Sequence, residues 1–230
     1  MSRFENVDVT VAAGFILAGG LSRRMFADGS GHGDKGLLPI GSRSMLAHVA
    51  ASLGRQTDTV VLNANGDPAR FASLGLPVIA DTVAGHVGPL AGILAGLRWA
   101  AARESAANGN AATHLVSVST DTPFFPDDLV TSLIAALQSA TGGERIAIAR
   151  SAGQIHPVIG LWPLALVDDL EQALQNGVRR VNDWAARHGT IVVDFPYRTI
   201  GGRVVDPFFN ANTPEDLEVA RTLAAALGGS

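Results

Sequence analysis

The residues that could perform chemistry gather in short stretches, and the first follows an apolar run near the start of the chain. That run, FILAGG, ends in Gly19 and Gly20 and is followed by Arg23, Arg24 and then Lys35. Glycines allow backbone N–H groups to come close to a phosphate, and the cationic side chains add positive charge. The whole combination favours an anion-binding site over a tight turn with solvated arginines.

Lys35 is unusual because it is the only lysine among the 17 basic residues of the chain. An ammonium is a compact, rotatable point charge, whereas a guanidinium is a planar fork. A lysine in a chain that otherwise uses arginine therefore indicates a site that needs the compact cation. The surrounding stretch GHGDKG is not a dinucleotide fingerprint, which must directly follow a strand, nor a P-loop, in which serine or threonine follows the lysine.

Carboxylates and amides follow three further apolar runs. Asp121 ends THLVSVSTD, Asp81 follows PVIA, and Asn63 and Asn65 end VVLNAN. A carboxylate at the end of a strand can hold Mg²⁺ together with substrate phosphates. For Asp121 we favour this role over helix capping, because Pro126 and the acidic residues after it already supply a helix start. Both asparagines could reach a base or ribose, although a turn-forming role fits Asn65 better.

The composition excludes several classes of protein. The 230 residues include no cysteine, which excludes disulfide frameworks, thiolate metal centres and cysteine nucleophiles. A net charge of −4 without any basic block argues against nucleic acid as a partner. No apolar run reaches the roughly 18 residues of a membrane span, and Glu5 and Asp8 stand where a signal peptide would be basic. We therefore expect a cytosolic protein without membrane contact.

Short β-branched runs alternate with longer segments of helical periodicity, which predicts βαβ units. We expect an α/β fold: one Rossmann-like, three-layer domain over 1–230 with a mainly parallel sheet and loose termini at 1–12 and 228–230. A break near Thr199–Pro207 could add a mixed edge to the sheet. The expected strands are Gly14–Ala18, Thr59–Asn63, Pro77–Ala80, His114–Ser119, Ile146–Ala149, Val158–Trp162 and Ile191–Phe195. The expected helices are Ser44–Leu53, Leu90–Arg103, Pro126–Gln138, Leu164–Gln175, Arg180–His188 and Pro214–Leu227, with Pro126 and Pro214 at the first helical position.

The motifs and their order along the chain resemble those of the molybdenum cofactor guanylyltransferases (MobA-type). This family belongs to the nucleotide-diphospho-sugar transferase-like superfamily. The amino-terminal signature is LAGGLSRRM followed by DKGLLPIG. The further matching stretches are VVLNAN at Val60–Asn65, GPLAGILAGL after Asp81, TDTPFFP at Thr120–Pro126, HPVIGLWP at His156–Pro163 and FFNANTPEDL at Phe208–Leu217. One departure is the glycine-rich insertion Phe26–Gly33, where the family has a shorter link. We expect this insertion to be mobile until GTP binds.

The resemblance implies a Mg²⁺-dependent nucleotidyltransferase that transfers GMP from GTP to the phosphate of molybdenum-molybdopterin and releases pyrophosphate. The implied catalytic residues are Lys35, Arg24 and Asp121, of which Asp121 also holds the metal. The implied contacts to GTP are Leu17, Ala18, Gly19, Gly20, Lys35, Asn63, Asp81 and Asp121. The implied residues on the pterin side are Asn210, Asn212 and His156. Thr213 and Asp216 instead fit a capping box at a helix start.

Asp81 also bears on the choice of base, because a carboxylate can accept from guanine N1–H and N2–H₂ together. Asp81 and the LAGG sequence favour guanine over the nearest alternative, a cytidylyl- or sugar-phosphate nucleotidyltransferase of the same fold. A non-catalytic nucleotide-binding module is a further alternative, which predicts loss of Lys35 or Asp121, and both are present. We expect a cytoplasmic monomer with GTP and molybdenum-molybdopterin as substrates. Molybdopterin-delivering and molybdoenzyme-maturation proteins are its expected transient partners.

Overall fold

A computed structural model describes residues 12–19, 25–26, 33–83, 88–104, 112–140 and 145–228 of the protein. Its strands are β1 (Ala12–Leu17), β2 (Pro39–Ile40), β3 (Arg43–Ser44), β4 (Val60–Asn63), β5 (Val78–Ile79), β6 (His114–Ser119), β7 (Ala147–Ser151), β8 (Gln154–Pro163), β9 (Ile191–Asp194), β10 (Arg198–Ile200) and β11 (Arg203–Val205). Its α-helices are α1 (Met45–Gly54), α2 (Pro89–Glu104), α3 (Leu129–Gln138), α4 (Val167–Gln175), α5 (Val181–Ala185) and α6 (Pro214–Gly228). Short 3₁₀ helices lie at Lys35–Leu37, Pro68–Leu74, Leu164–Leu166 and Ala186–His188.

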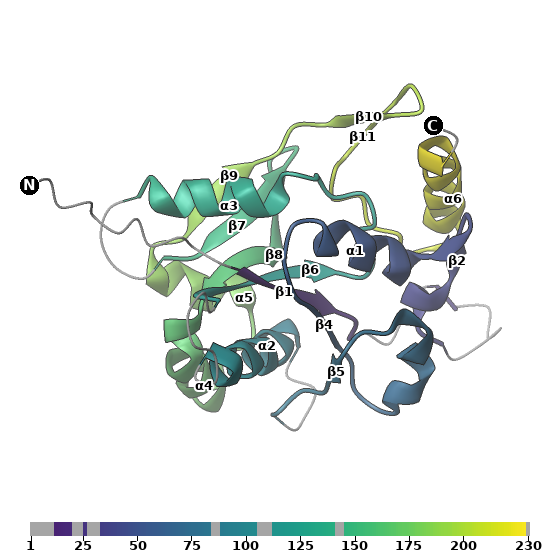
Figure 1. The fold of residues 1–230 in the computed structure, drawn as a ribbon. Coiled ribbons are helices and arrows are strands. Elements are labelled where there is room, and N and C mark those ends of the chain that lie inside the picture. The colour runs from purple at the N-terminus through teal and green to yellow at the C-terminus, as the bar shows by residue number, and fades with distance from the viewer. Residues whose placement is uncertain are drawn as a thin grey trace, which may run out of the picture.

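Within the described residues, a sheet of seven strands has the order β5-β4-β1-β6-β8-β7-β9 (Figure 1). The pairs β5–β4, β4–β1, β1–β6 and β7–β9 are parallel, and β8 is antiparallel to both β6 and β7. The expected α/β class with a mainly parallel sheet is therefore confirmed. The antiparallel strand lies inside the sheet, whereas the Thr199–Pro207 region contributes to a separate hairpin of β10 and β11.

Helices cover both faces of this sheet, with α1 and α3 on one side and α2 and α4 on the other (Figure 1). Every residue of β1 is buried, as expected for a central strand covered on two faces. Phe15 belongs to the hydrophobic core that includes Leu94 of α2, and Ile16 belongs to the core that includes Val49 of α1 and Leu133 of α3. The alternation of β1 side chains thus produces the three layers.

Helix α6 packs at one end of the sheet through a third, smaller core. Leu217 and Leu223 of α6 pack with Ile40, Met45 and Phe124. This packing anchors the segment before α6 next to the loop after β6.

Several boundaries differ from the sequence prediction. Helix α3 begins at Leu129, so the prediction of Pro126 at a first helical position is wrong. Residues 126–128 instead form a turn, in which the Pro126 carbonyl accepts a hydrogen bond from Gln56 Nε2 at 3.0 Å. Helix α6 does begin at Pro214, with acidic residues in its first turn. The β2–β3 hairpin was missed because strands of two residues are too short to show a periodicity.

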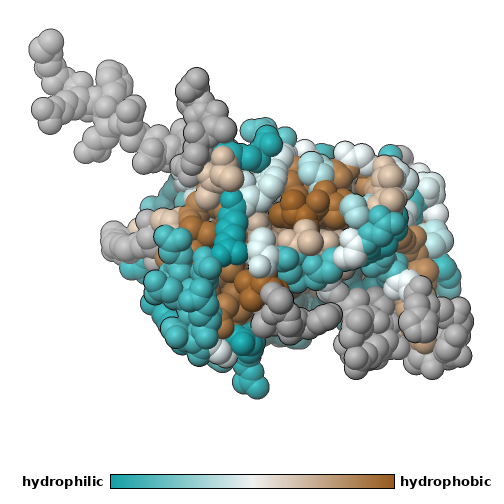
Figure 2. Space-filling view, turned by 90° about the horizontal axis from the view of Figure 1, so that it is seen from below, coloured by the Kyte–Doolittle hydropathy of each residue, from teal (hydrophilic) through white to brown (hydrophobic). Residues whose placement is uncertain are grey.

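The face of the molecule seen in Figure 2 carries hydrophilic side chains around smaller hydrophobic areas. Among the helices that the structure describes, none combines the length and the hydropathy needed to cross a bilayer.

Candidate functional site

A cleft of about 470 Å³ lies at the carboxyl ends of the parallel strands. This edge is where open α/β sheets bind ligands. The residues that line it are Leu17, Ala18 and Gly19 at the end of β1, Asn63 and Asn65 at the end of β4, Asp81 after β5, Ser119 of β6, Gly88, Pro89 and Gly92 at the start of α2, and Asp34, Arg70 and Val158. Five of the residues predicted to contact GTP therefore line this cleft. A sixth, Lys35, lines a small cavity that shares Ala18, Gly19 and Asp34 with the cleft.

Gly92 allows helix α2 to approach the floor of the cleft. A Cβ atom at this position would lie 2.5 Å from both Asn63 Oδ1 and Leu17 Cδ2. Such a distance is well below van der Waals contact, so any larger residue would displace these two side chains. At Gly19, by contrast, a Cβ would meet nothing within 4 Å among the described residues. Close packing therefore requires a glycine at Gly92 and not at Gly19.

Lys35 lies at the centre of a polar cluster built from three distant parts of the chain. Its Nζ donates to Asp121 Oδ2 at 2.6 Å and to Asn212 Oδ1 at 2.5 Å. Ser119 Oγ donates to the other oxygen of Asp121, Oδ1, at 2.5 Å. The side chains of Lys35 and Asp121 are only 16% and 15% exposed. The structure thus brings together Lys35, Asp121 and Asn212, three residues singled out in the sequence.

The segment that carries Asn212 is held by backbone and capping contacts. Ala211 N–H donates to the Asp121 carbonyl at 2.9 Å, which joins this segment to the loop after β6. Thr213 N–H donates to Asp216 Oδ2 at 3.0 Å, and Asp216 N–H donates to Thr213 Oγ1 at 3.2 Å. This reciprocal pair is the predicted capping box. The helix start therefore fixes the position of the Asn212 amide, and Asn210 lies half-buried on the same segment.

Asp121 is compatible with a Mg²⁺ ion that also binds substrate phosphates. Within the described residues there is no group of three or more His, Cys, Asp or Glu side chains that could hold a metal by themselves. Mg²⁺ is commonly held by one or two carboxylates plus phosphates and water. Each carboxylate oxygen of Asp121 accepts one hydrogen bond from a described side chain and keeps further lone-pair capacity. The Asp121 carboxylate therefore fits a Mg²⁺ ion whose other ligands are phosphates of a bound nucleotide and water.

Asp81 lies at the other end of the cleft in a network of amides. Its Oδ1 accepts from Asn63 Nδ2 at 3.0 Å, and its Oδ2 accepts from Asn65 Nδ2 at 2.8 Å. Asp81 N–H in turn donates to Asn65 Oδ1 at 2.9 Å. No arginine in the described part of the chain pairs with Asp81. The side chain of Asn65 thus bonds Asp81 through both its amide nitrogen and its amide oxygen, and the turn-forming role preferred for Asn65 stays a prediction.

Arg70 is a cleft residue that sequence analysis missed. Its Nε donates to Asp34 Oδ2 at 2.6 Å, and its Nη2 donates to the Asn65 carbonyl at 2.6 Å. It stands in the 3₁₀ helix Pro68–Leu74, where an arginine followed by Phe71 gave no local sign of function. The signal that was available is its position a few residues after VVLNAN.

His156 lies in a different environment from the other predicted residues. It is 7% exposed, its Nε2 lies 2.7 Å from Ser151 Oγ, and that hydroxyl donates to Asp206 Oδ1 at 2.6 Å. Its ring also packs on Phe208, with ring centroids 4.7 Å apart. Burial lowers the pKa of His156, and the charge of Asp206 opposes that shift. The contacts join the β7–β8 hairpin to Asp206 and Phe208, and His156 does not line the cleft.

Some predicted residues lie outside the described part of the chain. These are Gly20, Arg24 and most of the insertion Phe26–Gly33, together with the termini at 1–11 and 229–230. Of the insertion, Phe26 packs partly buried against the core of α6, and a Cβ at Gly33 would lie 3.5 Å from Phe26 Cζ.

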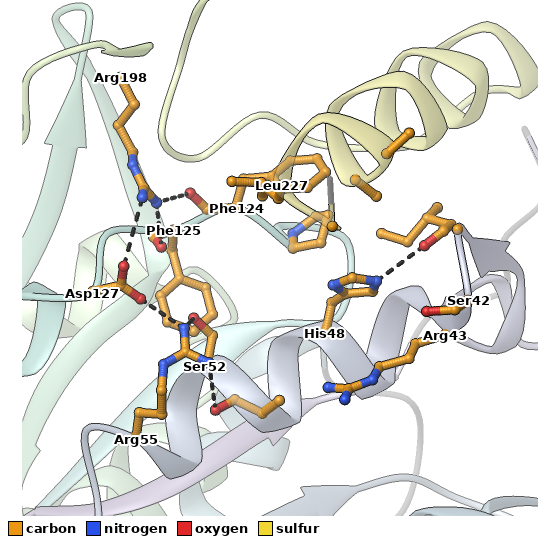
Figure 3. Close-up of a pocket in the computed structure, with 17 residues that line it drawn as sticks. Ser42, Arg43, His48, Ser52, Arg55, Phe124, Phe125, Asp127, Arg198 and Leu227 are labelled. Atoms are coloured by element: carbon orange, nitrogen blue, oxygen red, sulfur yellow. Dashed lines mark hydrogen bonds and ion pairs between the residues drawn. The ribbon is translucent and has the colours of Figure 1, made fainter. Parts of the chain in front are cut away.

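A second cavity, of about 630 Å³, lies between α1, α6 and the loop after β6 (Figure 3). Its lining residues among those described are all different from those of the cleft. Arg43 and His48 lie on one side of it, and Arg198 and Asp127 lie on the other (Figure 3). Burial lowers the pKa of His48, whose Nε2 lies 3.0 Å from the Ile40 carbonyl.

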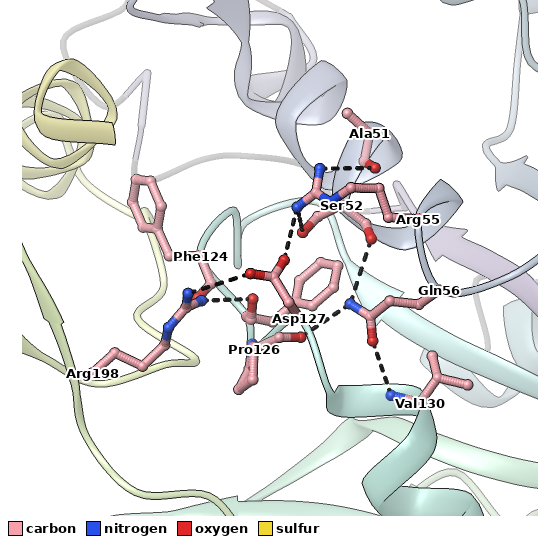
Figure 4. Close-up of polar contacts among 10 residues, drawn as sticks. Ala51, Ser52, Arg55, Gln56, Phe124, Pro126, Asp127, Val130 and Arg198 are labelled. Atoms are coloured by element: carbon pink, nitrogen blue, oxygen red, sulfur yellow. Dashed lines mark hydrogen bonds and ion pairs between the residues drawn. The ribbon is translucent and has the colours of Figure 1, made fainter. Parts of the chain in front are cut away.

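The wall of this second cavity holds the loop that follows Asp121 (Figure 4). Arg198 Nη1 donates to the carbonyls of Phe124 and Phe125 at 2.8 and 2.9 Å. Arg55 pairs with Asp127 at 2.8 Å, and Arg198 approaches the same carboxylate at 3.7 Å. Because the loop starts at Asp121, these contacts help to fix the carboxylate that Lys35 binds.

A family model and curated relatives match most of the chain. The family model described as the MobA-like NTP transferase domain matches residues 14–191. A molybdenum cofactor guanylyltransferase from Bradyrhizobium sp. is 48% identical over 219 residues, covering 94% of each chain.

Solved structures share the fold at lower sequence identity. Molybdopterin-guanine dinucleotide biosynthesis protein A from Archaeoglobus fulgidus superposes with a TM-score of 0.65 at 22% identity, covering 93% of this chain and 98% of the other. The 4-diphosphocytidyl-2C-methyl-D-erythritol synthase from Anaerococcus prevotii superposes with a TM-score of 0.64 at 13% identity, covering 93% and 95%. The shared fold therefore does not distinguish between nucleotides.

Proposed function

Because the chain belongs to the MobA-like NTP transferase family, we propose that it is a molybdenum cofactor guanylyltransferase. It transfers GMP from GTP to the phosphate of molybdenum-molybdopterin, forms the guanine dinucleotide of the cofactor and releases pyrophosphate. The observation that supports this most directly is that two polar clusters lie at the same edge of the sheet. One is Asp81 with its two amide partners, and the other is Lys35 with Asp121.

The Asp81 end of the cleft binds the base. Guanine presents two adjacent donors, N1–H and N2–H₂, which an ionised carboxylate accepts together. The Asn63 and Asn65 amides hold Asp81 in place through its two oxygens, and each oxygen keeps capacity for one donor of the base. Adenine lacks this pair of donors. The proposed selectivity for guanine follows from this match.

The Lys35 end of the cleft binds the phosphates. An ammonium has three donors, and the contacts to Asp121 and Asn212 use two of them. The third is directed at a phosphate oxygen, and its charge stabilises the negative charge of the transferred group. Asp121 and phosphate oxygens of the nucleotide would together hold Mg²⁺, which supplies further charge neutralisation and orientation.

The reaction is a phosphoryl displacement without a covalent enzyme intermediate. A phosphate oxygen of molybdopterin attacks the α-phosphorus of GTP and forms a new P–O bond. The bond from the α-phosphorus to the oxygen that bridges to the β-phosphorus breaks, and its electron pair leaves with pyrophosphate. The residues of the chain contribute position and charge, which carry most of the catalysis in such transfers.

Titration calorimetry of GTP, CTP and ATP, each with and without Mg²⁺, tests the proposal. GTP is expected to bind most tightly, and Mg²⁺ is expected to strengthen its binding. The variant Asp121→Asn should lose the Mg²⁺ effect, and Asp58→Asn, an exposed aspartate after α1, should keep it. Tighter binding of CTP, or a Mg²⁺ effect that survives in Asp121→Asn, would overturn the proposal.

Four further expectations from the sequence stay predictions. They are the roles of Arg24 and Gly20 at the phosphates, the pterin-side roles of Asn210, Asn212 and His156, action as a cytoplasmic monomer, and transient contact with molybdopterin-delivering and molybdoenzyme-maturation proteins.

A further inference from the structure

Arg70 connects parts of the cleft that no other described side chain joins by hydrogen bonds. Its guanidinium donates to the Asp34 carboxylate at 2.6 Å, to the Asn65 carbonyl at 2.6 Å and to the Asp67 carbonyl at 2.7 Å. Asp34 directly precedes Lys35, and the Asn65 side chain is paired with Asp81. One planar group therefore reaches both the phosphate end and the base end of the cleft.

The local structure around Arg70 is shaped for this position. Asp67 caps the 3₁₀ helix, its Oδ1 accepting from Ala69 N–H at 2.9 Å. Gly66 has a left-handed φ of +86°, and a Cβ there would lie 3.2 Å from Arg70 Nη1. The guanidinium also lies over the ring of Phe71, 4.5 Å from its centroid, and Phe71 is fully buried. The side chain is thus ordered before any ligand binds, which limits the entropy cost of binding.

The charge of Arg70 also matters to an anionic ligand. The cleft lining includes the carboxylates of Asp34 and Asp81, and both would repel a polyphosphate. The ion pair with Arg70 compensates the charge of Asp34, with the two side chains 31% and 24% exposed. Compensation of the Asp34 charge, however, affects only the binding of the phosphates. The bond to the Asn65 carbonyl affects the binding of the base, because the Asn65 side chain is paired with Asp81. The two effects can be measured separately.

We propose that Arg70 is a positioning residue that couples the two ends of the cleft, so that the Lys35 loop and the Asn65–Asp81 pair are held in register for one nucleotide. This inference rests on the proposed function, because it takes GTP as the ligand of the cleft. Arg70 acts through Asp34 and Asn65, and its own contact with substrate is not required.

Displacement of a GTP analogue that carries a fluorescent group on its ribose tests this role. Two competitors separate the ends of the cleft: guanosine, which is uncharged, and inorganic tripolyphosphate, which has no base. Arg70→Gln should weaken both competitors, each by about threefold to tenfold, the loss expected for one or two hydrogen bonds. Arg70→Lys keeps the charge but cannot reach Asp34 and Asn65 together, so it should recover tripolyphosphate binding and not guanosine binding.

A matched control is Arg103→Gln, since Arg103 is exposed at the end of α2 opposite to the cleft. It should leave both competitors unchanged. If Arg70→Gln weakens tripolyphosphate alone, Arg70 supplies only charge and the proposal is wrong. It is also wrong if neither competitor is affected, or if Arg70→Lys restores guanosine binding. A wild-type protein that does not bind the GTP analogue would overturn the proposed function itself, which is a distinct result.

Discussion

Asp81→Asn is the substitution that most sharply separates base recognition from local structure. In the wild-type protein both Asp81 oxygens accept from amides, at 3.0 Å from Asn63 and 2.8 Å from Asn65. The variant keeps one acceptor oxygen and gains an NH₂ group, which faces either an amide donor or a donor of guanine. Asn63 keeps its bond to the Ile79 carbonyl at 3.3 Å, so the fold of the cleft should survive.

The expected loss is that of one charge-assisted hydrogen bond to the base, about 1.5–3 kcal/mol. This corresponds to about tenfold to a hundredfold weaker binding of GTP. ATP never benefits from the carboxylate in this way, so its affinity should change little. Inosine triphosphate keeps N1–H and lacks the N2 amine, so it should bind the wild type less well than GTP does. In Asp81→Asn the affinities for these two nucleotides should converge.

The assay is titration calorimetry with the three nucleotides at constant Mg²⁺. Asp58→Asn is the matched control, because Asp58 is an exposed aspartate after α1 and does not line the cleft. It should leave all three affinities unchanged. If Asp81→Asn weakens GTP, inosine triphosphate and ATP by the same factor, Asp81 only shapes the turn with Asn65, and the explanation of guanine selectivity is refuted.

Three further changes test other parts of the structure. Lys35→Ala should lower turnover by about 10²–10³ while the fold stays intact, and Lys35→Arg should recover turnover only partly, which steady-state kinetics would measure. Gly92→Ala should destabilise the protein by about 1–3 kcal/mol in urea unfolding and weaken GTP binding, because the added Cβ displaces Asn63 and Leu17. Burial lowers the pKa of His114 from 6.5 to about 4. Since only the unfolded chain binds this proton between those values, the free energy of unfolding should fall by up to about 3 kcal/mol as the pH drops from 6.5 to 4. His114→Gln should remove that part of the fall.

Each of these expectations has a contrary outcome. Normal turnover of Lys35→Ala would show that its ammonium is not needed at the phosphates. Unchanged stability of Gly92→Ala would mean that α2 can move away from the cleft without cost. An identical pH profile of unfolding in wild type and His114→Gln would show that the buried imidazole does not control stability in this range.

Local patterns were sufficient for the residues that end strands. The positions of Asn63, Asp81 and Asp121 follow from short apolar runs, because parallel strands of one sheet direct their carboxyl ends to the same edge. The contact of Lys35 with Asn212, which are 177 residues apart, follows from no local pattern. Lys35 stood out as the only lysine of the chain, whereas Asn212 was found only because the motif order resembles a known family.

Other features depend on tertiary contacts that the sequence does not display. Arg70 looks like any arginine of a polar turn, and its role emerges only when Asp34 and Asn65 are placed beside it. Pro126 matches a helix start by composition, yet its turn contacts Gln56 and Arg198, and helix α3 begins only at Leu129. The antiparallel direction of β8 was equally hidden, since a buried strand has the same apolar pattern in either direction.

The most direct test of guanylyl transfer is to follow GTP labelled at its α-phosphorus in the presence of the protein, Mg²⁺ and molybdenum-molybdopterin. The label should appear in the guanine dinucleotide of the cofactor, with an equal amount of pyrophosphate released, and Lys35→Ala should slow both together. Label that stays in GTP while labelled CTP is transferred instead would contradict the proposed reaction.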